Sequence, residues 1–336
     1  MKDKVAVLLI NLGTPDSPSV PHVRSYLSQF LNDPRVIDIP WLPRKLLVNF
    51  IIVPFRAPKS AKVYQQLWTD KGSPLLFYSE RARDLLQEAL GDTHDVYLAM
   101  RYKNPSIPDV LERIRRKNYG RIVVLPMFPQ YASATTGSAH DEVMRVVRKW
   151  WVIPEIKFIN QYYDHPAFLD AFVSRGRQHD LSQYEHILFS YHGLPERQVD
   201  KVHEGGSCAD HNCESEINEA NKFCYKATCY ATTRLLAERL GIPPEKYTVC
   251  FQSRLDKEWL TPFSDAVVED CAKRGMKKIL AFSPAFTADC LETIIEIGEE
   301  YQELFQHNGG EKVQLVESLN DHPLWVKCLK DLVLSA

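Results

Sequence analysis

The sequence lacks three features that would place it in large classes of protein. Its charges nearly cancel, with 41 lysines and arginines against 43 aspartates and glutamates, so it lacks the basic surface typical of nucleic-acid-binding proteins. No apolar run approaches the roughly 20 residues that span a bilayer. The amino terminus shows no succession of charged, apolar and small residues typical of a signal peptide. We therefore expect a cytoplasmic protein without a nucleic-acid partner.

Two further absences narrow the choice of function. No Gly-x-Gly-x-x-Gly motif follows any strand-like run, which disfavours an enzyme that uses a nicotinamide or flavin cofactor. No internal repeat or low-complexity tract is visible. At 336 residues, the chain is long enough for two domains that each bury a core.

Apolar, β-branched runs alternate with helical patterns along most of the chain, which predicts parallel sheets built from crossover units. Strands are expected at 4–11, 96–101, 122–126, 156–160, 186–191, 247–251, 278–283 and 313–316. Helices are expected at 108–117, 139–150, 166–179, 231–240, 262–274, 291–305 and 322–334. Eight strands fit either one barrel or two smaller doubly wound halves.

Two segments that each follow a predicted strand carry side chains suited to chemistry. Ser-Tyr-His-Gly-Leu-Pro at 190–195 offers the imidazole of His192, and Ser-Pro-Ala-Phe-Thr-Ala-Asp-Cys-Leu-Glu-Thr at 283–293 offers the carboxylate of Glu292. With Arg101-Tyr102 and the segment 129–138, these motifs resemble the ferrochelatases, which insert Fe²⁺ into a porphyrin to make haem. The resemblance runs nearly end to end.

The resemblance implies an α/β fold of two similar Rossmann-like lobes, each a parallel sheet flanked by helices, with the active site in a cleft between them. The first lobe is expected at 1–155 and the second at 156–319, with a cysteine-bearing insertion at 204–229. A last helical segment, 320–336, is expected to pack back on the first lobe.

The resemblance also implies catalytic roles for His192 and Glu292 as proton acceptors and ligands of the incoming Fe²⁺. A base that is neutral near pH 7 suits the removal of pyrrole protons, so His192 fits that task on chemical grounds; which of the two residues handles protons and which handles metal stays open. Glu296 follows Glu292 at helical spacing and is expected on the path by which iron approaches. Cys290 is either a soft group that alters metal preference or a small buried side chain.

A porphyrin carries propionates on a large apolar disc, so its site needs cationic or hydroxyl anchors and aromatic walls. The positions that match such residues in the family are Arg56, Tyr64, Ser73, Arg101, Tyr102, Tyr131 and Trp259. Residues 41–55, rich in aromatic and aliphatic side chains, resemble the family's apolar mouth; they predict either peripheral contact with the inner membrane or an ordinary cover of the lobe.

Four of the eight cysteines crowd into one polar segment: Cys208, Cys213, Cys224 and Cys229. In a cytoplasmic protein such a cluster favours metal binding over disulfides. Four thiolates suit a [2Fe-2S] cluster, and some ferrochelatases carry one. Zinc is the alternative, because mixed cysteine and histidine sites are common and His203 and His211 lie nearby in the sequence.

The predicted function is insertion of Fe²⁺ into protoporphyrin IX. One alternative is a chelatase for another metal or for coproporphyrin. Another, from a different class, is a non-catalytic haem carrier or an iron or redox sensor; the presence of both His192 and Glu292 disfavours it, because a carrier needs an axial ligand but no opposing carboxylate. The oligomeric state is left open.

Overall fold

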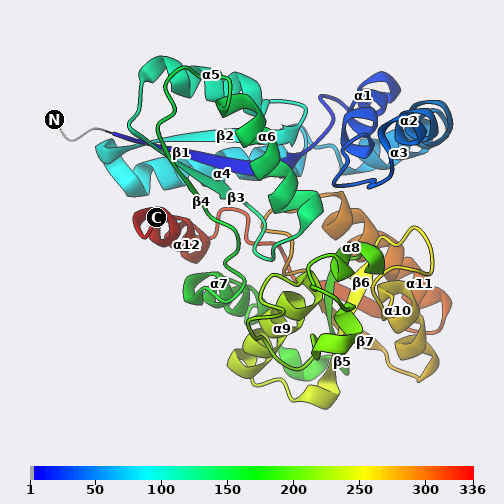
Figure 1. The fold of residues 1–336 in the computed structure, drawn as a ribbon. Helices are drawn as coiled ribbons and strands as arrows, with labels where there is room; N and C mark the ends of the chain where they lie inside the picture. Colours follow the sequence, from blue (N-terminus) through cyan, green and yellow to red (C-terminus); the bar gives the residue numbers. More distant parts are fainter. Residues whose placement is uncertain (1–3) are drawn as a thin grey trace. The chain divides into compact units, whose positions relative to one another are not determined.

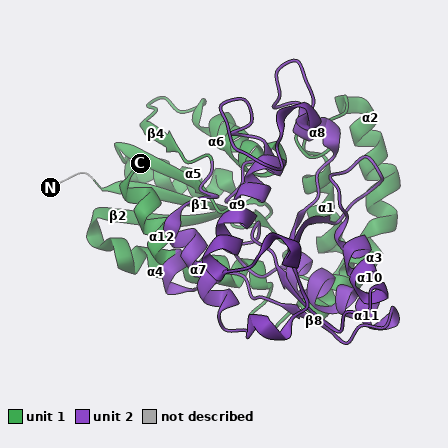
Figure 2. Ribbon diagram, turned by 90° about the horizontal axis from the view of Figure 1, so that it is seen from below, with its two compact units in different colours: residues 1–128, 133–160, 326–336 green, residues 129–132, 161–325 purple. Residues whose placement is uncertain are grey.

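The computed structural model describes residues 4–336, which form two compact units (Figures 1 and 2). Within the described residues, unit 1 contains 4–128, 133–160 and 326–336, and unit 2 contains 129–132 and 161–325. The boundary expected from the sequence between the first and second lobes lies between residues 155 and 156. Each unit is built around its own sheet of four parallel strands.

The sheet of unit 1 has the strand order β2-β1-β3-β4. Its strands are β1 (Val5–Gly13), β2 (His94–Tyr102), β3 (Arg121–Pro126) and β4 (Glu155–Phe158). Val5 pairs with both His94 and Arg121, so the three strands begin in step. Their carboxyl ends therefore reach the same edge of the sheet, where Arg101 and Tyr102 close β2. Runs of Val, Ile and Leu make the central strands, because this sheet is covered on its faces.

Helices cover the sheet of unit 1. α5 (Ile107–Lys117) and α6 (Ser138–Val147) pack their apolar sides on the strands, and Leu111 and Val143 meet Leu8 in one buried cluster. The remaining helical elements of this half of the chain are α1 (Val20–Leu31), α2 (Trp41–Leu46), the π-helix η1 (Leu47–Ile52), α3 (Val53–Leu67), α4 (Pro74–Leu90), η2 (Gly91–Thr93) and η3 (Ser133–Gly137). α12 (Pro323–Leu334) contributes its residues from 326 onward to unit 1.

The sheet of unit 2 repeats this wiring, with the order β6-β5-β7-β8. Its strands are β5 (His186–His192), β6 (Tyr247–Gln252), β7 (Lys278–Phe282) and β8 (Lys312–Leu315). α10 (Ser264–Lys273), the π-helix η7 (Glu292–Glu300) and α11 (Tyr301–His307) pack on one face through a buried cluster that includes Leu188, Ile279 and Phe305. The helical elements are α7 (Pro166–Gly176), η4 (Leu181–Gln183), α8 (Glu196–Asp200), η5 (Cys208–His211), α9 (Tyr225–Leu240), η6 (Pro244–Lys246), α10 (Ser264–Lys273), the π-helix η7 (Glu292–Glu300) and α11 (Tyr301–His307).

The predicted α/β class is confirmed, and all eight predicted strands are present. Two sheets, rather than one barrel, resolve the alternative left by the strand count. The structure also adds the helices between residues 20 and 90, which the sequence pattern did not predict, and starts α9 at Tyr225 rather than at residue 231. Among residues 4–336, no helix combines the length and apolar character needed to cross a membrane.

Candidate active site

His192 ends β5, the strand that pairs with neighbours on both sides in the sheet of unit 2. Its Nδ1 lies 2.6 Å from the carbonyl oxygen of Gly193. Because a carbonyl can only accept, Nδ1 carries the proton of the neutral ring, and Nε2 holds the basic lone pair. The hydroxyl of Tyr225 donates to the His192 carbonyl at 3.0 Å, and the Trp259 ring centre lies 6.4 Å from the imidazole centre.

Gly193 is required by the close packing that follows His192. Its amide donates to the carbonyl of Gln252 at 2.7 Å. A Cβ at this position would lie 2.8 Å from the same carbonyl oxygen and 3.2 Å from Trp259, closer than such contacts normally occur. The turn that presents the imidazole therefore depends on the missing side chain.

Glu292 begins the π-helix η7, in the segment after β7. Gln252, which is 1% exposed, donates from Nε2 to the Glu292 carbonyl at 3.0 Å and accepts from the Ser190 hydroxyl at 2.8 Å. Gln252 is also the register partner of His192 in β6. The buried side-chain amide of Gln252 thus connects β5, which ends at His192, with Glu292, the first residue of η7.

Glu296, predicted on the path of iron, has a carboxylate engaged by hydrogen bonds. It accepts from the Ser253 amide at 2.9 Å and hydroxyl at 2.5 Å, from Gln252 Nε2 at 3.1 Å and from the Tyr301 hydroxyl at 3.1 Å. These contacts fix η7 to the end of β6. Nearby, the thiol of Cys290 is buried, and burial together with the Glu292 carboxylate raises its pKa well above the ordinary value. Cys290 is therefore a neutral, buried side chain in this structure.

In unit 1, Arg101 and Tyr102 converge on a buried carboxylate. Asp33 Oδ2 accepts from Arg101 Nη2 at 2.6 Å, from the Tyr102 hydroxyl at 2.9 Å and from the Ser138 hydroxyl at 2.6 Å. Tyr102 is fully buried, and burial followed by the Asp33 charge raises the pKa of its phenol. Tyr102 therefore supports the position of Arg101 from beneath the surface.

The other predicted porphyrin contacts lie on separate elements. Arg56 is exposed on α3, and Tyr64 is buried on the same helix with its ring edge-on to Tyr26. Ser73 precedes α4 and is buried, and its hydroxyl has no hydrogen-bond partner among the described residues. In unit 2, the ring of Tyr131 packs against Phe223 with centroids 6.0 Å apart.

Three of the four clustered cysteines come together with a histidine. One donor atom from each of His203, Cys208, Cys213 and Cys224 lies within 4.8 Å of the other three, and all four residues are buried. We refer to these residues as the Cys/His group. A hydrogen bond from the Cys208 thiol lowers the pKa of Cys224 to about 5, which favours a thiolate in the group. Cys229 is outside the group, although the sequence predicts it as a ligand.

Comparison with known proteins decides the family. The family model described as ferrochelatase matches residues 4–336. A curated ferrochelatase from Coxiella burnetii (strain Dugway 5J108-111) is 44% identical over 97% of this chain and 92% of its own length. One from Legionella pneumophila (strain Lens) is 42% identical over 97% of this chain and 98% of its own. The chain belongs to the ferrochelatase family. It is a metal-inserting enzyme of haem biosynthesis.

Solved structures support the architecture of this ferrochelatase-family protein. SirB from Bacillus subtilis with Fe³⁺ aligns with a TM-score of 0.54 at 14% identity, covering 99% of this chain and 95% of the other. A SirB structure from Bacillus subtilis subspecies spizizenii in complex with cobalt gives the same TM-score at 13% identity and covers 94% of that chain. At these identities the likeness shows the fold alone.

Three residues that contact predicted site residues within their own unit were not predicted from the sequence: Asp33 and Ser138 beside Arg101 in unit 1, and Gln252 beside Glu292 in unit 2. Ser138 lies within the 129–138 motif and was visible as a hydroxyl beside a helix start. Gln252 directly follows the predicted strand at 247–251, where side chains at the carboxyl end of a parallel sheet gather. Asp33 directly precedes Pro34 after α1, and no local pattern marks an aspartate there as buried.

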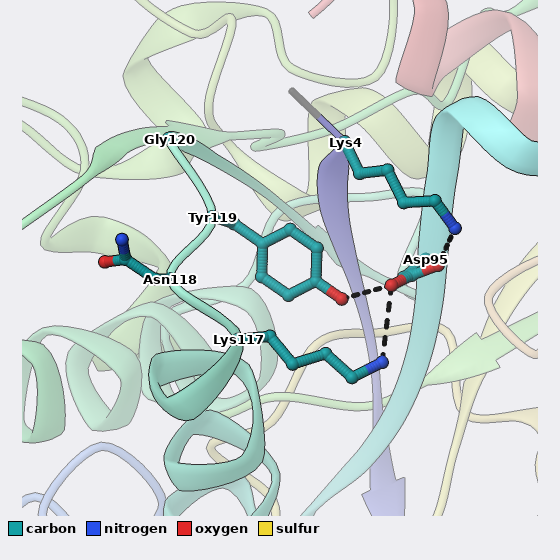
Figure 3. Close-up of a pocket in the computed structure, with 6 residues that line it drawn as sticks. All are labelled: Lys4, Asp95, Lys117, Asn118, Tyr119 and Gly120. Atoms are coloured by element: carbon teal, nitrogen blue, oxygen red, sulfur yellow. Dashed lines mark hydrogen bonds and ion pairs between the residues drawn. The ribbon is translucent and has the colours of Figure 1, made fainter. Parts of the chain in front are cut away.

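A pocket in unit 1 (Figure 3) lies at the amino ends of the strands, whereas Arg101 and Tyr102 lie at the carboxyl end of β2. It is lined by residues around the amino ends of β1, β2 and β3. Asp95 forms ion pairs there with Lys4 at 3.0 Å and Lys117 at 3.4 Å, and accepts a hydrogen bond from the Tyr119 hydroxyl. That hydrogen bond, with the two lysines, lowers the pKa of Asp95 to about 2. Since ligands of parallel sheets bind at carboxyl ends, we assign this pocket a structural role.

Proposed function

We propose that this protein inserts Fe²⁺ into protoporphyrin IX, with His192 as the first proton acceptor. The observation that carries this assignment is the hydrogen bond from His192 Nδ1 to the Gly193 carbonyl, because it leaves the Nε2 lone pair available. Two pyrrole N–H bonds break and the nitrogens bind iron. His192 Nε2 takes one proton, the Glu292 carboxylate takes the other, and both protons pass to water.

The experiment is an anaerobic assay with Fe²⁺ and protoporphyrin IX, followed by visible absorption. His192→Ala should lower turnover by at least about a hundredfold while porphyrin affinity stays unchanged, and His307→Ala, on the exposed end of α11, serves as the control. Porphyrin binding without haem formation by the wild-type protein would favour a carrier. Faster turnover of coproporphyrin would change the substrate and leave the chemistry intact.

Arg101 is proposed to bind a propionate of the porphyrin. Its Nε and Nη2 are committed to Ser138 and Asp33, which fixes the guanidinium plane, and the side chain remains 14% exposed. A fixed guanidinium can hold a carboxylate with little further loss of side-chain entropy. Arg56, Tyr64 and Ser73 are proposed as further anchors, and Tyr131 and Trp259 as aromatic walls.

The exposed apolar residues of α2, η1 and α3 are proposed to contact a lipid surface from which the water-insoluble porphyrin is taken. This apolar lip consists of Trp41, Leu42, Leu46, Phe50, Ile51 and Phe55, which are 51% to 75% exposed. Large apolar side chains gathered in this way mark interaction surfaces. Substituting Phe50 and Phe55 together with serine should weaken cosedimentation with phospholipid vesicles, whereas Trp151→Ser, exposed outside the lip, should not.

The Cys/His group supports the coarser conclusion that residues 203–224 can hold a metal. The finer prediction from the sequence, a [2Fe-2S] cluster on four cysteines, needs Cys229 as the fourth ligand. No step of the proposed insertion reaction depends on this group, because iron enters and leaves the reaction as Fe²⁺.

A further inference from the structure

Asp289 and Asn320 are two buried polar residues of unit 2 that contact each other beside the start of η7. Asp289 precedes Glu292 in the segment after β7, and Asn320 lies in the loop that follows β8. Their exposed fractions are 8% and 4%. Burying a carboxylate or an amide costs free energy unless hydrogen bonds replace those made to water. The partners of these two side chains therefore show what their burial achieves.

The two residues bond to each other reciprocally. Asn320 Nδ2 donates to Asp289 Oδ2 at 2.7 Å, and the backbone amide of Asp289 donates to Asn320 Oδ1 at 2.9 Å. The backbone amide of Asn320 also donates to the Thr287 carbonyl at 2.9 Å. Asn320 therefore holds the segment 287–289 through both ends of its side-chain amide and through its own backbone.

The backbone conformation of Asn320 limits which residues could make these contacts. Its φ is 51°, in the left-handed region that residues other than glycine seldom adopt. Asparagine and aspartate tolerate this region better than other residues that carry a side chain. Glycine would also accept it but has no side chain to reach Asp289. Asparagine at this position thus combines the required backbone with one side-chain donor group and one acceptor.

The other oxygen of Asp289 reaches the first turn of η7. Oδ1 accepts from the Thr293 hydroxyl at 3.1 Å and from the Ser318 amide at 3.2 Å. The Thr293 hydroxyl in turn accepts from the Cys290 amide at 3.0 Å. Glu292 lies between Cys290 and Thr293 in the chain. The carboxylate of Asp289 therefore fixes the backbone on both sides of Glu292.

The loop that carries Asn320 is itself anchored to its surroundings. The Val316 amide donates to the Ala281 carbonyl at 2.9 Å, which continues the pairing of β8 with β7. Arg175 on α7 forms an ion pair with the Glu317 carboxylate at 2.8 Å and donates to the Leu319 carbonyl at 3.4 Å. A loop that is fixed in this way can hold the segment it contacts in one position.

We propose that Asn320 is a positioning residue for Glu292: by bonding to Asp289, it sets where η7 begins and where the Glu292 carboxylate lies. This inference rests on the catalytic role proposed for Glu292. Gln252 supports the Glu292 carbonyl from β6, at one edge of the sheet, and Asn320 supports the same turn from the loop after β8, at the other edge. Asn320 acts through Asp289 and is not itself a catalytic residue.

The test exchanges the two side chains. Asn320→Asp alone places two carboxylates face to face, and Asp289→Asn alone sets two donors against each other whichever way the Asn320 amide turns. The double variant Asp289→Asn/Asn320→Asp again places a donor opposite an acceptor and keeps an oxygen at residue 289 for Thr293 and Ser318. We expect kcat to fall by about ten- to a hundredfold in each single variant with an unchanged KM for porphyrin, and most of this loss to be recovered in the double variant.

Hydrogen exchange of the backbone amides from 289 to 296 gives a second measurement that needs no turnover. Protection should fall in both single variants and return in the double variant. Asn118→Asp is the matched control, because Asn118 has a φ of 54° but is exposed in unit 1, and it should change neither turnover nor exchange. Asn320→Gly keeps the left-handed backbone and removes the side chain, so it should show the same losses even if Asn320→Asp fails to fold.

Full turnover by Asn320→Asp or by Asn320→Gly would overturn the proposal. A double variant that regains protection without turnover would also overturn it, since Asp289 would then act in the reaction itself, and so would a double variant that regains neither. Wild-type protein that makes no haem would refute the proposed function instead. The exchange measurement would still decide whether Asn320 fixes the start of η7.

Discussion

Asp33→Asn should lower the unfolding free energy of unit 1 strongly, although it replaces only one carboxylate oxygen by an amide nitrogen. The Asp33 side chain is 2% exposed, and its Oδ2 accepts from Arg101, Tyr102 and Ser138. Asparagine in its place removes the negative charge that balances Arg101. Its NH₂ group can also face the N–H and O–H groups that donated to Asp33. Removing one partner of a buried ion pair costs about 3 to 5 kcal/mol, and we take about 3 kcal/mol because Arg101 retains some solvent contact.

The matched control is Asp141→Asn, which removes a carboxylate 3.7 Å from Arg35 in a pair that is 37% and 55% exposed. Such surface pairs contribute about 0 to 1 kcal/mol. Denaturant unfolding should therefore separate the two variants by about 2 to 3 kcal/mol, and the thermal midpoint of Asp33→Asn should fall by roughly 6 to 12 °C. The KM for porphyrin should rise as Arg101 loses its fixed position. Equal stabilities of the two variants would refute the reasoning.

Three further predictions concern buried groups. Gln252→Leu removes one donor from each of two acceptors of η7, the Glu292 carbonyl and the Glu296 carboxylate, so unfolding free energy should fall by about 2 kcal/mol and kcat should fall with unchanged porphyrin affinity; an unchanged kcat would contradict it. Gly193→Ala should reduce activity and stability, whereas Gly120→Ala, with open space around its Cβ, should alter neither. Burial lowers the pKa of His140 from 6.5 to about 4. Below pH 6.5 the unfolded chain alone takes up this proton, so stability is lost as the pH falls, by about 2 kcal/mol at pH 5. His140→Phe should remove that loss and the exposed control His307→Phe should retain it, as measured by denaturant unfolding at pH 5 and 8; an equal loss in His140→Phe would exclude His140 as the source.

The strands were predictable because parallel sheets covered by helices need continuous β-branched runs, and these stand out between polar segments. The helices before residue 90 were harder to predict. α3 contains Pro58 in its interior and α4 begins at Pro74, so prolines interrupt the patterns that indicate helices. The aromatic residues of 41–55 suggested a lip, but the packing of η1 and α3 against α1 is a contact that no local sequence pattern reveals.

The residues of the candidate site also divide into those that the sequence could place and those that it could not. His192 ends β5 and Glu292 begins η7 in the segment after β7, so both lie in segments that follow or end predicted strands, while their catalytic roles stay predictions. Cys229 was predicted as a ligand together with the other three clustered cysteines, and that call stays a prediction, because the sequence does not show which of these thiols lie together. α9 begins at Tyr225, so Cys229 lies buried within the helix and Cys224 is the residue directly before its first turn. Asp33 could not be predicted, since its partners lie far away in the chain.

The order of strands in the two sheets also sets how the chain folds. Val5 pairs with Arg121, and Ile187 pairs with Leu280, so β1 and β5 each pair with a strand that lies much later in the sequence. Pairings of this kind slow folding and leave apolar edges exposed while they form. The crossover from β5 to β6 contains the Cys/His group. A metal that closes residues 203–224 shortens the free chain in that crossover and lowers the entropy cost of joining its strands. A metal bound there would then speed formation of the sheet of unit 2 as well as stabilise it.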